Sequence, residues 1–304
     1  MILFRDCLNE AEAKELEHLA ETCSHADGLS WSVPDDADLY FLFYEDAADF
    51  DCLSENSSAK CSLKEAAPSL SAVLCVFHMG DTKNGLPIDE LIALTRPDAR
   101  RRGYFRALFS TARPLLRPMI RFSLPTASSE KAAASGKKNA ASRQFLLQIG
   151  AEHDHDEYLM ELQLSKTPAA NTSAAETFTA GTFAAHALYA VSEAPPIRLH
   201  FNMQDGITAV SCRYGECFLS DWSDGVYLFG LLVYERFRGQ GFGSRILHAL
   251  FSRLCMQSGS RVVLEVSSDN LPAVKLYQKM GFQTIDAVSY FYLENPDFKK
   301  EPLC

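Results

Sequence analysis

The sequence has few of the features that mark secreted, membrane-spanning or nucleic-acid-binding proteins. No apolar run approaches the roughly 20 residues of a transmembrane helix, and no signal peptide is visible. The nine cysteines are an odd number without a C-x-x-C pair or the Cys/His spacing of a zinc site, so we expect reduced thiols in a cytoplasmic protein and no metal. The formal net charge of −10 argues against nucleic acid as a partner.

Length and composition indicate a globular protein with more than one domain. The chain has 304 residues, which is enough for two domains of ordinary size. Its 47% hydrophobic and 22% charged residues are ordinary for a soluble protein. The acidic balance is compatible with a cationic amine substrate, although net charge mainly reports solubility.

One glycine-rich stretch, Arg238-Gly239-Gln240-Gly241-Phe242-Gly243-Ser244, organises the second half of the chain. It follows the apolar run 226–233, which is typical of a buried strand, and it precedes residues 245–254, where apolar residues recur at helical spacing. The first turn of a helix has backbone N–H groups without internal partners, and glycines let a phosphate approach them. Arg238 adds a positive charge with a geometry suited to phosphate.

The spacing of the glycines decides among phosphate sites. A dinucleotide fingerprint needs G-x-G-x-x-G, whereas this stretch has G-x-G-x-G, and the Gly-Lys-Ser/Thr of an NTPase loop is absent. The pattern R-x-x-G-x-G remains. A glycine-rich turn without a ligand is the alternative interpretation.

A second pattern lies downstream. Residues 261–266 are expected to form a strand. The following helix would have Asp269 or Asn270 as its N-cap, Pro272 in its first turn and Gly281 at its end. From Asn270 the chain spells Asn-x-x-Ala-x-x-x-Tyr-x-x-x-Gly-Phe.

Together, R-x-x-G-x-G and this second signature resemble the GCN5-related N-acetyltransferases, over about residues 205–294. The resemblance implies an α/β fold in which a mixed, mostly antiparallel sheet is flanked by helices. It also implies acetyl-CoA as co-substrate, no metal, and transfer of the acetyl group to a primary amine of a small molecule or peptide. A CoA-binding sensor or scaffold without turnover is the alternative function, and transfer of a longer acyl group is a third.

The resemblance also implies the site residues. The loop would hold the pyrophosphate, residues 231–233 would offer main-chain groups to the pantetheine arm, and Tyr277 would be the general acid that protonates the thiolate. Tyr277 could instead be a core tyrosine, and Asn270 could act only as a helix cap. The implied cofactor contacts are Leu231, Leu232, Val233, Arg238, Gly239, Gln240, Gly241, Phe242, Gly243, Ser244, Asn270, Ala273 and Tyr277.

The general base is left open by the sequence. Glu265 lies on the strand after the loop helix and is the candidate, but a water chain could also remove the proton. Asp221, Asp224 and Glu235 lie closer to turns, where carboxylates are usually solvated. The remaining side chains with suitable chemistry are expected to pack or to face solvent, namely His200, His248, Cys212, Cys217 and Cys255.

The first half of the chain repeats the pattern in weaker form. Aligned with the later loop, Arg100 falls on Arg238 and Gly103 on Gly241, but Phe105 replaces Gly243. Leu146 stands where the second copy has Tyr277, which removes an ionisable hydroxyl. We therefore expect a degenerate first copy, closed by a strand at 158–162 as 290–293 closes the second. Such a copy could still bind CoA poorly or shape the substrate cleft.

The domain boundaries follow from composition. We expect a degenerate domain at 1–165, an Ala/Thr/Ser-rich linker at 166–182 and an acetyltransferase domain with the acetyl-CoA site at 183–304. The second domain is shortened at its front, where family members usually place helices over the substrate. The protein is expected to be a monomer or a homodimer, with no membrane partner.

Overall fold

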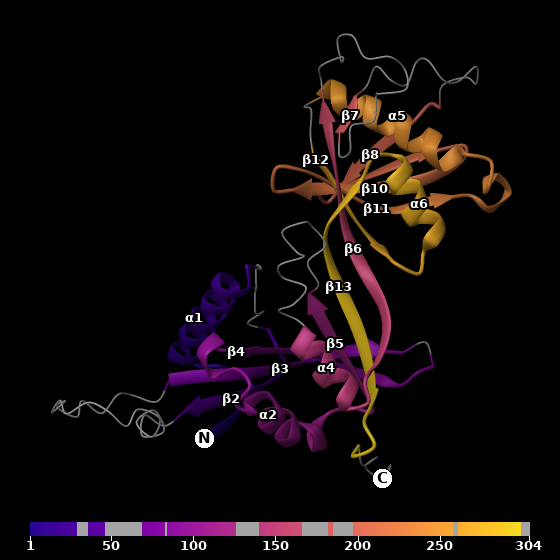
Figure 1. Cartoon of the computed structure of the whole chain (residues 1–304). Helices are drawn as coiled ribbons and strands as arrows, with labels where there is room; N and C mark the ends of the chain where they lie inside the picture. The colour runs from indigo at the N-terminus through magenta and orange to yellow at the C-terminus, as the bar shows by residue number, and fades with distance from the viewer. Residues whose placement is uncertain are drawn as a thin grey trace. The chain divides into compact units, whose positions relative to one another are not determined.

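The computed structural model describes residues 1–28, 36–45, 69–82, 84–125, 140–165, 182–184, 197–257 and 261–298. The chain divides into two compact units. The first unit contains Met1–Leu124, Ser135–Asp154 and Tyr290–Cys304, and the second contains Pro125–Ala134 and His155–Ser289. Figure 1 shows the elements along the chain.

The first unit is built on a mixed sheet. Its strands follow the order β1-β2-β3-β4-β5-β13, with β4 and β5 parallel and the pairs from β1 to β4 antiparallel. The strands are β1 (Ile2–Arg5), β2 (Leu39–Glu45), β3 (Ser69–Asp81), β4 (Pro87–Thr95), β5 (Met119–Pro125) and β13 (Gln283–Glu294), and the helices are α1 (Glu10–Asp27), η2 (Pro97–Ala99), α2 (Tyr104–Ala112), η3 (Arg113–Leu115) and α4 (Ala140–Gln148).

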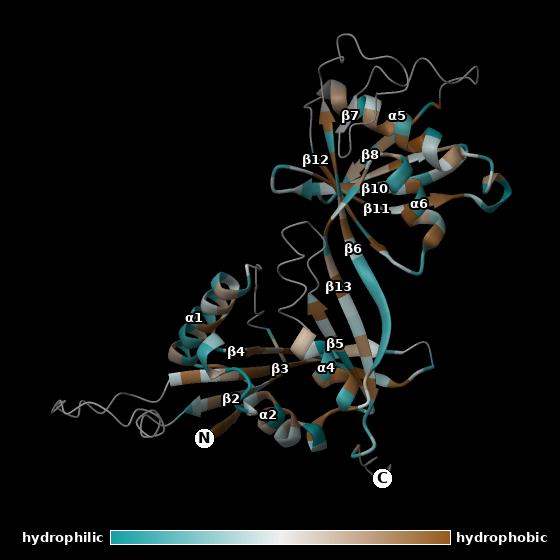
Figure 2. Cartoon of the chain, in the orientation of Figure 1, coloured by the Kyte–Doolittle hydropathy of each residue, from teal (hydrophilic) through white to brown (hydrophobic). Residues whose placement is uncertain are grey.

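Helices cover both faces of this first sheet. α1 starts with a capping box between Asn9 and Glu12, ends at Gly28 with φ 63°, and packs on Tyr40 and Leu42. It carries hydrophilic and hydrophobic residues together, as an amphipathic helix does (Figure 2). α2 and α4 pack on the other face, whose core includes Phe41.

The second unit is also a mixed sheet, with strand order β6-β12-β11-β10-β9-β8. β11 and β12 are parallel, β7 pairs parallel with β6, and the remaining pairs are antiparallel. The strands are β6 (Glu152–Ser165), β7 (Thr182–Ala184), β8 (His200–Gln204), β9 (Ile207–Cys212), β10 (Gly215–Trp222), β11 (Gly225–Val233) and β12 (Arg261–Ser267), and the helices are η5 (Glu235–Phe237), α5 (Phe242–Gln257) and α6 (Leu271–Lys279).

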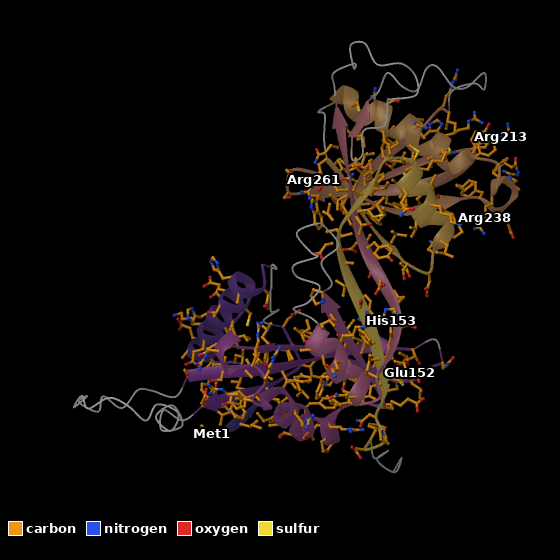
Figure 3. The ribbon with its side chains drawn as sticks, in the orientation of Figure 1. Met1, Glu152, His153, Arg213, Arg238 and Arg261 are labelled. Atoms are coloured by element: carbon orange, nitrogen blue, oxygen red, sulfur yellow. The ribbon has the colours of Figure 1, made fainter. Side chains whose placement is uncertain are left out.

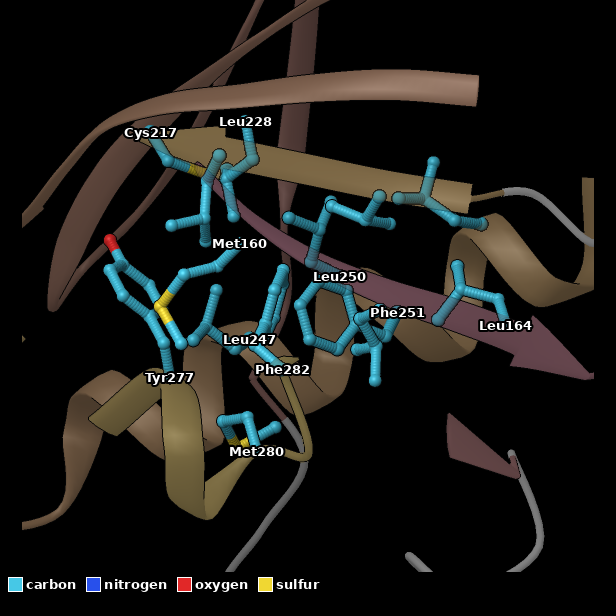
Figure 4. Close-up of a cluster of buried hydrophobic side chains, with 14 of the residues drawn as sticks. Met160, Leu164, Cys217, Leu228, Leu247, Leu250, Phe251, Tyr277, Met280 and Phe282 are labelled. Carbon is cyan, nitrogen blue, oxygen red and sulfur yellow. The ribbon is translucent and has the colours of Figure 1, made fainter. Parts of the chain in front are cut away.

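The core of the second unit lies between its sheet and the helices α5 and α6. Leu247, Leu250 and Phe251 of α5 are fully buried against strand residues such as Met160 and Leu228 (Figure 4). Both of these helices pack on this one face, and within the described residues no helix of the unit packs on the opposite face. The expectation that the front of the second copy is shortened concerns residues from 183 on, most of which up to 196 lie outside the described residues.

The two long strands β6 and β13 carry the chain between the units (Figure 1). β6 pairs antiparallel with β12 of the second unit, from Glu157↔Ser267 to Gln163↔Arg261. β13 neighbours β5 of the first unit. Each closing strand thus completes the sheet of the other copy. The expected linker at 166–182 lies outside the described residues apart from Thr182, and the linear boundaries at 165 and 183 stay a prediction.

Two further features bear on the sequence expectations. None of the helices in the described ranges is both long and apolar enough to cross a membrane. Six of the described cysteines, Cys7, Cys23, Cys75, Cys212, Cys217 and Cys255, are free thiols.

Candidate functional site

The loop between β11 and α5 has the geometry of an anion site. Gly239 and Gly241 have φ values of 73° and 79°, a region that favours glycine, and a Cβ at either position would meet nothing within 4 Å. The helical ladder begins with the bond from Arg245 N to Gly241 O at 3.3 Å. The N–H groups of residues 242–244 therefore precede the intrahelical ladder and can serve a ligand, with the helix dipole behind them.

The Nε of Arg238 is hydrogen-bonded to the backbone, and the residue is exposed to solvent. Its Nε donates to Val233 O at 3.0 Å, which ties the start of the loop to the end of β11. The side chain lies at the surface of the second unit (Figure 3). In the described part of the chain no carboxylate forms an ion pair with Arg238, so the two terminal nitrogens can bind a phosphate.

Aromatic side chains pack this loop against the β9–β10 turn. Phe242, the first residue of α5, stacks on Tyr214 with ring centroids 4.1 Å apart, and Phe237 packs edge-on against both rings at 5.4 and 5.0 Å. The guanidinium of Arg245 covers the Phe242 ring at 5.0 Å. Phe237 and Phe242 are thus anchored on the β9–β10 turn, and Gly239 and Gly241 lie between them.

β11 contains a β-bulge beside the loop. Glu216 pairs with Leu232 and Phe218 with Phe229, so one extra residue of β11 lies between these pairs. Gly230 occupies the bulge with φ 62°, and a Cβ there would lie 2.8 Å from the Phe218 ring. Only glycine fits this position without displacing the ring.

The parallel strands β11 and β12 separate before β11 ends. Their register runs from Gly225↔Arg261 to Tyr227↔Val263 only, whereas β11 continues to Val233. Tyr234 N donates to Tyr214 O at 3.0 Å, so alternation places the backbone groups of Leu232 toward β10 and those of Leu231 and Val233 toward β12. An extended ligand can therefore add to β11 as a further strand at this opening.

Tyr277 reaches the same region from α6. Its side chain is 8% exposed, and its hydroxyl points toward Cys217, beside Met160 (Figure 4). Burial, and then the nearby Cys217 thiol, raise the pKa of Tyr277 to about 12. Among the described residues the hydroxyl has no hydrogen-bond partner, so a protonated phenol is left with an unused donor.

The other expected contacts have clear structural roles. Asn270 caps α6 by accepting from Ala273 N at 3.3 Å, while Ala273 packs at the edge of the core. A Cβ on Gly243 would lie 3.0 Å from Leu276 Cδ2, so this third glycine makes room for close packing of α5 on α6. Gly239 and Gly241 are the two glycines of this loop beside which the structure leaves open space.

The candidate base Glu265 and the candidate acid Tyr277 lie on opposite faces of the sheet. Val262, Leu264 and Val266 of β12 point into the core that contains Tyr277, so Glu265 points the other way and is exposed. Its Oε2 accepts from Tyr227 Oη at 3.0 Å.

The weaker acid–base candidates are paired, exposed or half-buried. Asp224 pairs with Arg261 at 2.9 Å, and this hydrogen bond lowers its pKa. Asp221, Glu235 and His200 are exposed. Burial lowers the pKa of His248, which is held on α5. Among the described residues no group of three His, Cys, Asp or Glu side chains could hold a metal ion.

The first unit repeats the backbone of this loop. Arg100 Nε donates to Thr95 O at 3.1 Å, as Arg238 does to Val233. Gly103 has φ 87°, matching Gly241, and Arg101 adopts φ 65° where the second copy has Gly239. The aligned positions 100 and 238 thus carry the same interaction in both units.

The chemistry of the first loop differs. Arg100 donates from both terminal nitrogens to Asp27, at 2.7 and 2.9 Å, and Arg102 Nη1 donates to Glu45 at 2.6 Å. β4 pairs with β3 in unbroken register from Ala72↔Thr95 to His78↔Asp89, so no bulge corresponds to Gly230. Phe105 packs edge-on against Phe145 at 5.0 Å, where the second unit has Gly243 against Leu276.

Sequence reasoning missed the bulge at Gly230 and the aromatic support of the loop. In the first unit, Thr95 at the end of β4 lies seven residues after Ile88, the first residue of β4 that pairs with β5. In the second unit, Val233 at the end of β11 lies eight residues after Gly225, the first residue of β11 that pairs with β12. The extra residue is the bulge. The aligned glycine loops fix the C-terminal ends of β4 and β11. Aligning the starts of these two strands as well would have revealed the extra residue in β11.

Comparison with known proteins finds similarities in the second half of the chain. Residues 206–282 match the family model of the acetyltransferase (GNAT) family. The chain is 42% identical over 57 residues to mycothiol acetyltransferase of Corynebacterium aurimucosum and 36% identical over 59 residues to spermine/spermidine N(1)-acetyltransferase of Bacillus subtilis. Each match covers 19% of this chain, and they cover only 18% and 39% of the respective relatives.

The fold comparison extends over the whole chain. A tandem GNAT protein from the clavulanic acid biosynthesis pathway, solved without AcCoA, superposes with a TM-score of 0.54 and 13% identity. The alignment covers 99% of this chain and 100% of that one. The fold is therefore that of two tandem GNAT-like domains.

Proposed function

The chain belongs to the acetyltransferase (GNAT) superfamily through residues 206–282, and on this premise we propose that it transfers the acetyl group of acetyl-CoA to a primary amine. One observation carries the proposal: the open glycine loop lies at the end of the strand whose pairing stops early, on the side where Tyr277 is buried. In this proposal the glycine loop binds the diphosphate of acetyl-CoA, the opening beside β11 binds its extended arm, and Tyr277 lies next to the thioester, so that the reacting groups are held in position.

The proposed binding mode uses main-chain groups. The N–H groups of the first turn of α5 and the Arg238 guanidinium would bind the pyrophosphate, because both supply donors to an anion. Leu231 and Val233 would pair with the pantetheine arm in the place of a neighbouring strand. A backbone N–H of β11 would stabilise the oxyanion that forms on the thioester carbonyl.

The proposed reaction is a direct attack without an acyl-enzyme. The neutral amine nitrogen attacks the carbonyl carbon, a C–N bond forms, and the C–S bond breaks. Tyr277 donates its phenolic proton to the departing thiolate, and Glu265, directly or through water, accepts the proton that the amine nitrogen loses. The products are the amide and CoA thiol, and proton exchange with water restores both side chains.

The first unit is proposed to be a degenerate copy that does not bind acetyl-CoA. Two of its loop arginines, Arg100 and Arg102, pair with Asp27 and Glu45, and its β4 lacks a bulge. A cytoplasmic location is also a proposal, supported by the free thiols among the described cysteines. A monomer or a homodimer fits the tandem arrangement.

A thiol-release assay with acetyl-CoA and a panel of primary amines tests the function. At least one amine should release CoA thiol in step with a product heavier by one acetyl group in mass spectrometry. Binding of acetyl-CoA without turnover across the panel, including peptides with free N-termini, would indicate the sensor or scaffold. A deeper site would show faster transfer from longer acyl-CoA thioesters.

A further inference from the structure

Two glutamates lie beside the opening between β11 and β12. β12 pairs with β11 only as far as Val263, so Glu265 lies in the part of β12 that borders the opening. On the other side of β12, strand β6 places Glu157 opposite Ser267, while Glu265 lies opposite Leu159. The residues that alternate with the two glutamates point into the core under α5 and α6, so both glutamates lie on the opposite face of the sheet. We call Glu157 and Glu265 the glutamate pair.

An ion pair on the same two strands shows that such side chains reach each other. Arg261 and Glu161 hold the same diagonal relation, four residues earlier in β12 and four residues later in β6. Their side chains meet, with Arg261 Nε 2.7 Å from Glu161 Oε2. Because the pairing of antiparallel strands repeats every two residues, the glutamate pair has the same geometry as this ion pair. The two carboxylates are therefore within reach of each other.

The glutamate pair has no cation to balance it. In the part of the chain that the structure describes, neither Glu157 nor Glu265 forms an ion pair. Glu265 Oε2 accepts from Tyr227 Oη at 3.0 Å, and Glu157 is half-buried. Burial and then the hydrogen bond to Glu265 raise the pKa of Tyr227 to about 12, and the charge of Glu157 adds to this rise. Like charges this close cost stability, which is typical of a functional site.

The opening can be approached from both faces of the sheet. Tyr277 lies on the face that α5 and α6 cover, and the glutamate pair lies on the other face. A thioester held between β11 and β12 would thus have its proton donor on one face and two proton acceptors on the other. An amine that enters from the second face passes the glutamate pair before it reaches the thioester.

The reaction requires more than one proton acceptor. An alkyl amine with a pKa of about 10 is an ammonium ion at neutral pH. It loses one proton before the attack, because the attacking nitrogen needs its lone pair, and a second once the C–N bond has formed. A single carboxylate that has taken the first proton must pass it to water before it can take the second.

Building on the proposed function, we infer that Glu157 is a second catalytic base. The ammonium group lies against the glutamate pair, and Glu157 takes its first proton. The neutral nitrogen attacks the carbonyl carbon, and Glu265 takes the second proton as the C–N bond forms. The C–S bond breaks, and Tyr277 protonates the thiolate. Both glutamates pass their protons to water and Tyr277 regains one, so that each turnover releases one proton.

This role also gives the exchanged strand a part in the reaction. β6 precedes the glycine loop by more than half of the second unit's length in sequence, and it pairs with β12 inside the second unit. The first half of the chain would thus supply a catalytic residue to the site that the second half builds.

Two acceptors of similar size test the inference on the full-length protein at saturating acetyl-CoA. Propylamine has a pKa of about 10 and glycinamide, as an α-amino compound, of about 8, so at pH 8 only glycinamide is largely neutral in solution. We expect Glu157→Gln to lower kcat/KM for propylamine at least about tenfold at pH 8, and for glycinamide less than about threefold.

The pH series separates this role from a structural one. Between pH 8 and 10 the solution supplies more neutral propylamine, so the loss caused by Glu157→Gln should shrink. Tyr277, with a pKa of about 12, stays protonated over this range. A variant that was merely misfolded would lose the same factor with both acceptors at every pH, and thermal melting checks the fold.

Two further variants complete the comparison. Glu265→Gln should slow both acceptors across the pH series, because the second proton is lost whatever the charge of the free amine. Glu161→Gln, on the same face of β6 but paired with Arg261, is the matched control. It should keep the parent's propylamine-to-glycinamide ratio.

Failure of the inference and failure of the proposed function are distinguishable. Equal losses for the two acceptors, or a propylamine loss that does not change with pH, would overturn the role of Glu157 while acetyl transfer stands. If the parent reacts only with another amine of the panel, the same pH series is run with that amine. If the parent releases thiol with no amine, the proposed function fails and the inference falls with it.

Discussion

Arg100 donates hydrogen bonds from both terminal nitrogens to the carboxylate of Asp27, at 2.7 and 2.9 Å, although the two residues are 73 positions apart in the sequence. The aligned Arg238 has no such carboxylate among the described residues and leaves its guanidinium exposed. The same loop backbone therefore serves two purposes. In the first unit its charge holds α1 to the sheet, and in the second its charge is available to a ligand.

Removing this carboxylate should destabilise the first unit. Asp27→Ala leaves the partly buried Arg100 without its partner, and we expect the free energy of unfolding to fall by about 1–2 kcal/mol, discounted because Arg100 is partly exposed. Urea denaturation measures the change. Acetyl transfer should be unaffected at temperatures where the variant is folded, and a large loss of kcat would indicate that the first loop takes part in the reaction.

Tyr277→Phe should slow the reaction while acetyl-CoA still binds. Loss of a positioned general acid lowers rates by about 10²–10⁴-fold. Calorimetry should give a Kd for acetyl-CoA within about threefold of the parent, since the ring stays in its core site. Tyr104→Phe, which removes a phenol bonded to Glu45 in the first unit, is the control and should keep kcat. A Tyr277→Phe protein with unchanged kcat would exclude this phenol as the acid.

The free energy of unfolding should fall at alkaline pH because the buried Tyr277 resists ionisation in the folded protein. Its pKa is raised from 10.0 to about 12 by burial, so below pH 10 the phenol is protonated in the folded and unfolded chains alike. Between pH 10 and 12 the unfolded chain ionises first, and the free energy of unfolding drops by about 1 kcal/mol by pH 11. Tyr277→Phe should reduce the loss measured by urea denaturation at pH 9 and 11. An equal loss in both proteins would show that Tyr277 titrates normally.

The bulge should be intolerant of a side chain. Gly230→Ala places a Cβ at φ 62° and 2.8 Å from the Phe218 ring, so strain and a clash add. We expect destabilisation of about 2–3 kcal/mol and a drop in kcat, because the opening beside β11 changes shape. Gly206→Ala has the same sign of φ, at 78°, in open space, and should cost only about 1 kcal/mol. Equal effects of the two changes would mean that the ring contact is unimportant.

The sequence was sufficient to predict the local elements of the site. Glycines 239 and 241, the cap at Asn270 and the helix end at Gly281 each depend on neighbours within a few residues, and all lie in the expected elements. The alignment of Arg100 with Arg238 was also readable, because the spacing to the following glycine is the same.

Long-range features could not be predicted in the same way. The pairing of β6 with β12 depends on which sheet edge is free once both halves have folded, and no residue type in 158–162 encodes that choice. The partner of Arg100 comes from a distant helix. The close approach of Gly243 to Leu276 is visible only after α5 and α6 have packed, and the expected cofactor contact of Gly243 stays a prediction.

Calorimetric titration of acetyl-CoA into the full-length protein and into the variants Gly241→Ala and Gly103→Ala tests the central claim most directly. Both glycines have positive φ in open space, so both changes should cost similar stability, about 1 kcal/mol. The parent should bind one acetyl-CoA per chain, Gly241→Ala should bind at least about tenfold more weakly, and Gly103→Ala should bind like the parent. No binding by the parent, or weaker binding in Gly103→Ala alone, would contradict an acetyl-CoA site in the loop before α5.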